Sequence, residues 1–207
     1  MSRQNKKNDL RVIRTHQQLE DAFRALSFRC DPAAFTIQQL CDEAGIRRTT
    51  FYQHFEDKHD FYIWFLLRIQ TQYIQDHPLE LKDDDDVVQV CMQCVRKMLS
   101  FLRENSRLIN AIANDRLPMA SFLGGFYTAY RESLKQHIKR YNDRKDILSL
   151  FPHDLIARYY IGAVVSSVVW WYGAMDIYKE QNFLEDLEQL LRHSPQYLED
   201  HSLHINQ

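Results

Sequence analysis

Apolar side chains recur every three or four residues along most of the chain, the spacing that places them on one face of an α-helix. No segment alternates apolar and polar residues for long enough to predict a β-strand. Five glycines and five prolines are spread over 207 residues, so helix breakpoints are few. The pattern predicts an all-α fold.

The periodic segments and their breakpoints place the expected elements. We expect helices over residues 10–28, 36–45, 47–55, 57–75, 87–103, 106–115, 118–141, 152–178 and 183–193. The acidic run at 83–86 is expected to cap the next helix, because carboxylates complement the dipole at a helix N-terminus. The helices before residue 57 make one small unit. We therefore expect an N-terminal three-helix domain at 1–66 and a larger helical domain at 67–207, linked by the helix at 57–75.

Local signals on both sides of residue 45 predict two short helices joined by a tight turn. Thr36 and Gln39 have the spacing of a capping box, which starts a helix. Gly45 can adopt the left-handed backbone that ends one. Phe51 and Phe55, four residues apart, face the same side of the second helix. Their burial would leave the opposite face of that helix free.

The free face carries basic, hydroxyl and amide side chains. They are Arg47, Arg48, Thr49, Thr50, Tyr52, Gln53 and His54. Such a set can bond phosphate oxygens and base edges in a DNA major groove. The alternative is a helical hairpin without DNA, because any small hairpin needs a turn glycine and polar outer residues. The pattern alone leaves both interpretations open.

The stretch TFYQHFEDK, preceded by a glycine turn and a TIQQL helix, resembles the DNA-binding region of TetR-family transcriptional regulators. The resemblance covers about residues 10–66. It implies a helix-turn-helix that binds double-stranded DNA, followed by a domain for effector binding and dimerisation.

The resemblance also assigns roles by position. It implies phosphate contacts for Thr36, Thr50, Tyr52 and Lys58, and recognition-helix positions for Arg48, Thr49, Gln53 and His54. The chain departs from the family pattern at Arg47, where serine or asparagine often caps the recognition helix, and at Thr49, where glycine or alanine is frequent. Arg47 is therefore either a solvated surface residue or a base contact, and the first is favoured because phosphate and solvent are the usual destinations of an arginine at a helix entry.

Charge is unevenly placed along the chain. The formal net charge is only −2, so any attraction to DNA depends on local clusters. Within residues 1–19 the charged side chains are Arg3, Lys6, Lys7, Asp9, Arg11 and Arg14. This segment is either a flexible basic arm that follows a neighbouring groove or a terminus that only aids solubility.

The sequence gives no sign of a metal, a cofactor or a membrane anchor. Cys91 and Cys94 form the only Cys-x-x-Cys pair, and they lie within a helical pattern without a second pair of ligands, so we interpret them as core thiols. No apolar run is long enough to span a membrane, and no secretory signal is present, which predicts a cytoplasmic protein. We expect neither metal nor cofactor.

The larger domain is expected to receive the regulatory input. Its late helices have broad apolar faces, which predicts a homodimer whose recognition helices lie roughly 34 to 36 Å apart on a palindromic operator. Aromatic residues at helical spacing are either core packing or the lining of an effector pocket. Those taken as pocket candidates are Phe101, Phe122, Phe126, Tyr130, Tyr160 and Trp170, with Trp64, Tyr127, Tyr159, Trp171 and Tyr172 as further possibilities.

The predicted function is that of a homodimeric repressor, not an enzyme, controlled by an effector. The segment RYYIGAVVSSVVWWYG resembles a TetR subgroup that includes a dihydroxyacetone-kinase operon activator, which works with a protein partner. An activator controlled by a protein co-regulator is therefore an alternative, as is an interaction module that has lost DNA binding. A helical enzyme would use pairs such as His153 with Asp154 or His193 with Glu188, but neither pair sits in a recognisable catalytic frame.

Overall fold

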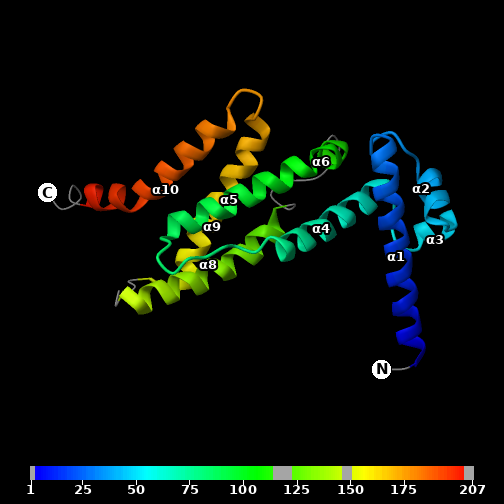
Figure 1. Cartoon of the computed structure of the whole chain (residues 1–207), viewed down its shortest axis with the longest axis horizontal. Helices are drawn as coiled ribbons and strands as arrows, with labels where there is room; N and C mark the ends of the chain where they lie inside the picture. Colours follow the sequence, from blue (N-terminus) through cyan, green and yellow to red (C-terminus); the bar gives the residue numbers. More distant parts are fainter. Residues whose placement is uncertain (1–2, 114–122, 146–150, 203–207) are drawn as a thin grey trace. The chain divides into compact units, whose positions relative to one another are not determined.

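The computed structural model describes residues 3–113, 123–145 and 151–202 (Figure 1). Every regular element in these ranges is a helix, which confirms the all-α fold. The helices are α1 (Arg3–Arg29), α2 (Ile37–Ala44), α3 (Arg48–Tyr52), α4 (Lys58–Asp76), α5 (Val87–Glu104), α6 (Ser106–Ala113), α8 (Gly124–Lys145), α9 (His153–Ala174) and α10 (Glu180–Ser202). Within the described ranges no helix is both long and apolar enough to cross a membrane.

The helices group into two compact units. The first unit contains the described residues up to Ile69 together with α6, and the second contains the described residues from Gln70 to Glu104 and those of α8, α9 and α10. The helix α4 contributes residues to both units.

The core of the first unit is aromatic. It contains Phe23, Phe35, Phe51, Phe55, Phe61, Tyr62 and Phe65, all buried. Phe23 of α1 contacts Phe65 of α4 with ring centroids 4.5 Å apart, and Phe51 of α3 contacts Phe61 of α4 at 6.0 Å. Burial of such large rings is the main stabilising contribution in a unit of this size. The cluster therefore fixes α3 against the two long helices.

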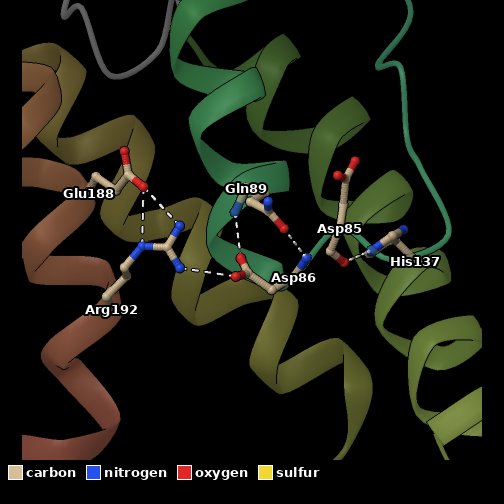
Figure 2. Close-up of polar contacts among 6 residues, drawn as sticks. All are labelled: Asp85, Asp86, Gln89, His137, Glu188 and Arg192. Atoms are coloured by element: carbon tan, nitrogen blue, oxygen red, sulfur yellow. Dashed lines mark hydrogen bonds and ion pairs between the residues drawn. The ribbon is translucent and has the colours of Figure 1, made fainter.

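In the second unit α5 packs against α8, α9 and α10, and α8 lies along α9. Polar contacts fix the start of α5 (Figure 2). Asp86 and Gln89 form a reciprocal capping box, with Gln89 N–H bonded to Asp86 Oδ1 at 2.8 Å and Asp86 N–H to Gln89 Oε1 at 2.6 Å. Buried His137 of α8 donates from Nε2 to the Asp85 carbonyl at 2.7 Å. The expected acidic cap of α5 is confirmed.

An ion pair ties α10 to the same cap. Arg192 bonds Asp86 Oδ2 at 3.0 Å and Glu188 Oε1 at 2.8 Å (Figure 2). Burial opposes ionisation of Asp86, but hydrogen bonds from the Gln89 backbone and Arg192 outweigh it and lower the pKa of its carboxyl. The acidic run thus serves the packing of helices.

The expected elements are present, but several ends differ. The helix α1 begins at Arg3, so the segment interpreted as either a flexible basic arm or a solubilising terminus forms its first turns instead, because no glycine or proline interrupts it. For the same reason α8 continues to Lys145, through the segment predicted to begin a loop. The chain turns after Ala174, where the Trp171 indole donates a hydrogen bond to the Tyr178 carbonyl. The helix α9 is therefore shorter than predicted, and α10 begins earlier than predicted, at Glu180. The predicted helix start at Pro118 lies outside the described residues.

Gly45 gives a direct test of the turn between α2 and α3. Its φ of 66° is left-handed, and a Cβ built there would meet no atom within 4 Å. We therefore expect Gly45→Ala to lower the free energy of unfolding by about 1 kcal/mol through backbone strain alone. Urea denaturation followed by circular dichroism measures the change.

Gly124→Ala is the matched control. Gly124 lies in α8, also has open space around its Cα, and does not have a positive φ. Alanine there should leave stability unchanged or raise it by a few tenths of a kcal/mol, about the helix-propensity difference or less. Equal destabilisation by both substitutions would contradict the strain argument.

Candidate nucleic-acid interface

The turn between α2 and α3 is built by the residues that the sequence singles out. The Gln39 N–H bonds Thr36 Oγ1 at 3.2 Å, and the Thr36 N–H bonds Gln39 Oε1 at 2.8 Å, which is the predicted capping box. Gly45 adopts the left-handed conformation, and the Ile46 N–H returns to the Cys41 carbonyl at 3.0 Å. The direction in which α3 leaves the turn is therefore fixed by backbone bonds.

The helix α3 is shorter than the predicted recognition helix. It spans Arg48–Tyr52, and Gln53 and His54 form a turn after it. Arg47 takes the N-cap position with an extended backbone and no side-chain capping bond, because arginine has no acceptor oxygen to offer the free N–H groups. Phe51, fully buried, and Phe55 hold the inner face.

The outer face of α3 is solvent-exposed, as predicted. Arg47, Arg48, Thr49 and Gln53 are exposed, Thr50 is half-buried, and 47% of Tyr52 is accessible although it is aromatic. Arg48 Nη2 donates to the Tyr52 hydroxyl at 3.3 Å, and its guanidinium carbon lies 5.8 Å from the Tyr52 ring centroid. No carboxylate in the described part of the chain forms an ion pair with Arg47 or Arg48. These charges stay available to an anionic partner.

Two of the predicted phosphate contacts also hold the scaffold. Lys58 Nζ donates to the carbonyls of Ala33 and Phe35 at 3.0 and 3.1 Å, which ties the start of α4 to the loop before α2. The Thr36 hydroxyl both accepts and donates within the capping box. An ammonium has three donors, so Lys58 keeps one for a phosphate, whereas a phosphate contact by the Thr36 hydroxyl would compete with the cap.

His54 lies against α1, where it is half-buried. Its ring centroid is 5.0 Å from that of His16, which in turn is 4.6 Å from Trp64 of α4. This contact leaves Gln53 as the more exposed of the two residues predicted to read bases. Trp64 thus belongs to the aromatic contacts of the first unit.

Two solved structures share this fold. The fatty acid degradation regulator FadR from Bacillus halodurans aligns over 84% of this chain and 96% of its own, with 15% identity and a TM-score of 0.52. The transcriptional regulator FadR from Bacillus subtilis, in complex with stearoyl-CoA, aligns over the same shares with 16% identity and a TM-score of 0.54. The chain has the fold of the FadR regulators.

A third solved structure aligns with a lower TM-score. A protein from Shewanella sp. PV-4, described as a tetR family transcription regulator, aligns over 85% of this chain and 95% of its own, with 13% identity and a TM-score of 0.47. No family model and no curated protein matches the sequence.

In this FadR-like fold the pocket candidates divide between core and surface. Phe101, Phe126 and Tyr130 are buried together, with ring centroids 5.3 and 5.5 Å apart along the series. The buried Tyr130 hydroxyl has no hydrogen-bond partner among the described residues. Tyr160 is half-buried, and Phe122 lies outside the described residues.

Trp170 lies on the surface instead. It is 58% exposed and lines a groove of about 480 Å³ between α9 and α10. The groove is lined by Ser167, Trp170, Tyr178, Phe183, Asp186, Leu187, Gln189, Leu190 and His193. An open groove with an apolar floor on two adjacent helices is suited to contact with another helical surface.

The side chains considered for metal, redox or enzyme chemistry have structural surroundings in the described residues. Cys91 and Cys94 are buried free thiols; burial raises the pKa of Cys91 to about 12 and that of Cys94 well above its ordinary value. Asp154 forms ion pairs with Arg131 and Arg158, both at 2.7 Å. Glu188 is paired with Arg192. Both carboxylates of the rival enzyme pairs are thus held by arginines.

His16, which no pattern in the sequence singles out, is expected to make the stability of the first unit depend on pH. Burial first, and then the charges of His54 and Arg68, lower the pKa of His16. Arg68 itself is paired with Glu20 at 2.5 Å. In the unfolded chain His16 takes up a proton near its ordinary pKa of about 6.5, while in the folded chain it does so only at lower pH. The unfolded state therefore binds more protons between these two values, and stability falls as pH drops below about 6.5.

We expect urea midpoints for the first unit to decrease from pH 7.5 to 5.5, and the decrease to be smaller in His16→Phe, which keeps the ring contact without a titrating group. His193→Asn, which changes an exposed histidine of α10 in the second unit, is the control and should leave the decrease for the first unit as large as in the wild type. An undiminished decrease in His16→Phe would assign the effect to other groups. Glu20 does not interfere, because burial opposes its ionisation but bonds from Arg24 and Arg68 lower its pKa, away from this window.

Proposed function

We propose that the chain is a DNA-binding transcriptional regulator that acts as a homodimer on a palindromic operator. The observation that carries this proposal is the two-sided chemistry of α3. Phe51 and Phe55 close its inner side, while its outer side offers guanidinium, hydroxyl and amide groups that have no acidic partner within residues 3–113, 123–145 and 151–202. Such a helix after a tight turn suits the major groove of DNA.

The charge distribution supports the same partner. With a net charge of −2 the chain is not a general polycation, so attraction to DNA must come from local clusters of cations. Arg11 and Arg14 of α1 are exposed, as are Arg47 and Arg48 beside the turn. Phosphate contacts would use these cations for affinity, and the base edges would be read from α3.

The second unit supports the dimer. Leu155, Tyr159 and Trp170 are exposed, and their spacing of 4 and 11 residues places them on one face of α9. Leu190 of α10, which is 68% exposed, lines the groove next to this face. A second copy that presents the same two helices would cover these side chains and form a four-helix bundle about a two-fold axis.

An effector would act on the second unit. The cluster around Tyr130 combines buried apolar rings with a hydroxyl that none of the described residues bonds, and a bound small molecule could bond it. FadR from B. subtilis is found with stearoyl-CoA, but an alignment at 16% identity does not choose the ligand of this chain. We propose a repressor that leaves its operator when such an effector binds. An activator controlled by a protein partner is the alternative.

Selection of binding sites from a random duplex library tests the central proposal. We expect the purified protein to enrich a palindrome with half-sites one or more helical turns apart. Affinity for that site should fall steeply with salt, with a log–log slope of about −0.9 for each phosphate contacted. A scrambled duplex of the same length is the control. No enriched sequence from a folded dimer would contradict direct DNA recognition and favour the interaction-module alternative.

Trp170→Glu tests the dimer surface. A buried carboxylate without a partner is costly, so the variant should dissociate to monomers at micromolar concentration in light scattering. Phe28→Glu is the control, because Phe28 is 90% exposed but lies in α1. We expect that variant to remain a dimer. A Trp170→Glu dimer as tight as the wild type would place the interface elsewhere.

A further inference from the structure

The two arginines beside the turn differ in how they are held. Arg47, at the N-cap of α3, makes no side-chain hydrogen bond or ion pair with the described residues. Arg48 is held twice by Tyr52, through the bond from Nη2 to the hydroxyl at 3.3 Å and through the cation–π contact with the ring at 5.8 Å. Like any arginine, Arg48 is charged at physiological pH. One cation is free to move and the other is oriented.

The orientation matters because of the donors that remain. A guanidinium has five N–H donors in a planar fork. After one N–H of Nη2 is given to Tyr52, Nη2 keeps its second N–H and Nη1 keeps both. One donor on each terminal nitrogen is the arrangement required for a bidentate bond to two adjacent acceptors.

In the major groove this pair of acceptors belongs to guanine. Guanine presents O6 and N7 side by side, whereas adenine replaces O6 with an amino donor that would face the arginine. A phosphate also accepts two bonds from a guanidinium, but such a contact carries no sequence information, and the unheld Arg47 is free to make it.

The Tyr52 hydroxyl has a second capacity. It accepts from Arg48, so its own O–H hydrogen remains available as a donor. The side chain is 47% exposed on the same face of α3. It can therefore bond a phosphate oxygen while it supports the guanidinium, which links the position of the DNA backbone to the direction of the base-reading group.

We propose that Arg48 recognises a guanine in each operator half-site, and that Tyr52 positions its guanidinium for that contact. This inference rests on the proposed function, since it names the base that the DNA-binding face reads. Arg48 is the specificity-determining residue, and Tyr52 is the positioning residue.

The test is site selection with four variants beside the wild type, followed by affinity measurements on duplexes that differ at one base pair. We expect the wild type to select one fixed G·C pair per half-site and to lose roughly 5- to 150-fold in affinity when it becomes A·T. Arg48→Ala should bind G·C and A·T at that position within about twofold of each other. Arg48→Lys keeps the charge but not the fork, so the preference should also fall while the salt slope stays the same.

Tyr52→Phe isolates the positioning role, because it removes the hydroxyl and keeps the ring. We expect its preference for guanine to lie between those of the wild type and Arg48→Ala. The matched control is Arg47→Ala, which should keep the full preference for guanine while its salt slope becomes shallower by about 0.9 if Arg47 contacts one phosphate. The three positions changed are all exposed, and circular dichroism checks that each variant is folded.

Two outcomes would overturn the inference, and they are distinguishable. If the wild type enriches an operator and Arg48→Ala keeps every base preference but has a shallower salt slope, Arg48 is a phosphate contact and only this inference fails. If the wild type itself enriches no sequence as a folded dimer, the proposed function fails, and the inference fails with it.

Discussion

The burial of Phe51 and Phe55 is the constraint on which the DNA-binding surface depends. The helix α3 has five residues, far too few to be stable in isolation, because helix nucleation costs more than so few backbone bonds return. Tertiary packing supplies the missing stability. Both phenylalanines contact Phe61 of α4, with ring centroids 6.0 and 5.2 Å apart. The position of the outer face is thus a consequence of the inner one.

This dependence explains why several polar side chains near the site belong to the scaffold. Lys58 holds two carbonyls of the loop before α2, and Thr36 closes the α2 cap. Neither can be removed without also disturbing the support of α3. Loss of DNA binding in such variants would therefore not identify a contact, whereas a change at exposed Arg48 or Tyr52 leaves the scaffold intact.

The sequence predicts what neighbouring residues determine. The capping box of α2, the left-handed Gly45 and the paired phenylalanines each depend on residues within four positions, and all are as expected. The contacts of Lys58 span 23 and 25 residues, and the contact between His16 and His54 joins two helices. No local pattern indicates these. The helix α3 also begins one residue later than expected, because Arg47 takes the N-cap position without a side-chain capping bond.

A short reading helix has a further consequence for the second unit. Each good bidentate contact discriminates between bases by about 1–3 kcal/mol, and α3 exposes few side chains able to make one. One copy alone would distinguish its site poorly from the many competing sequences. In a dimer, binding of the first copy to its half-site makes binding of the second copy intramolecular. The base preferences of the two copies then add to the specificity for the whole operator. In the proposed regulator the exposed apolar face of α9 is therefore as necessary to sequence recognition as the arginines of the first unit. Any effector that alters the pairing of the two copies would control DNA binding without touching α3.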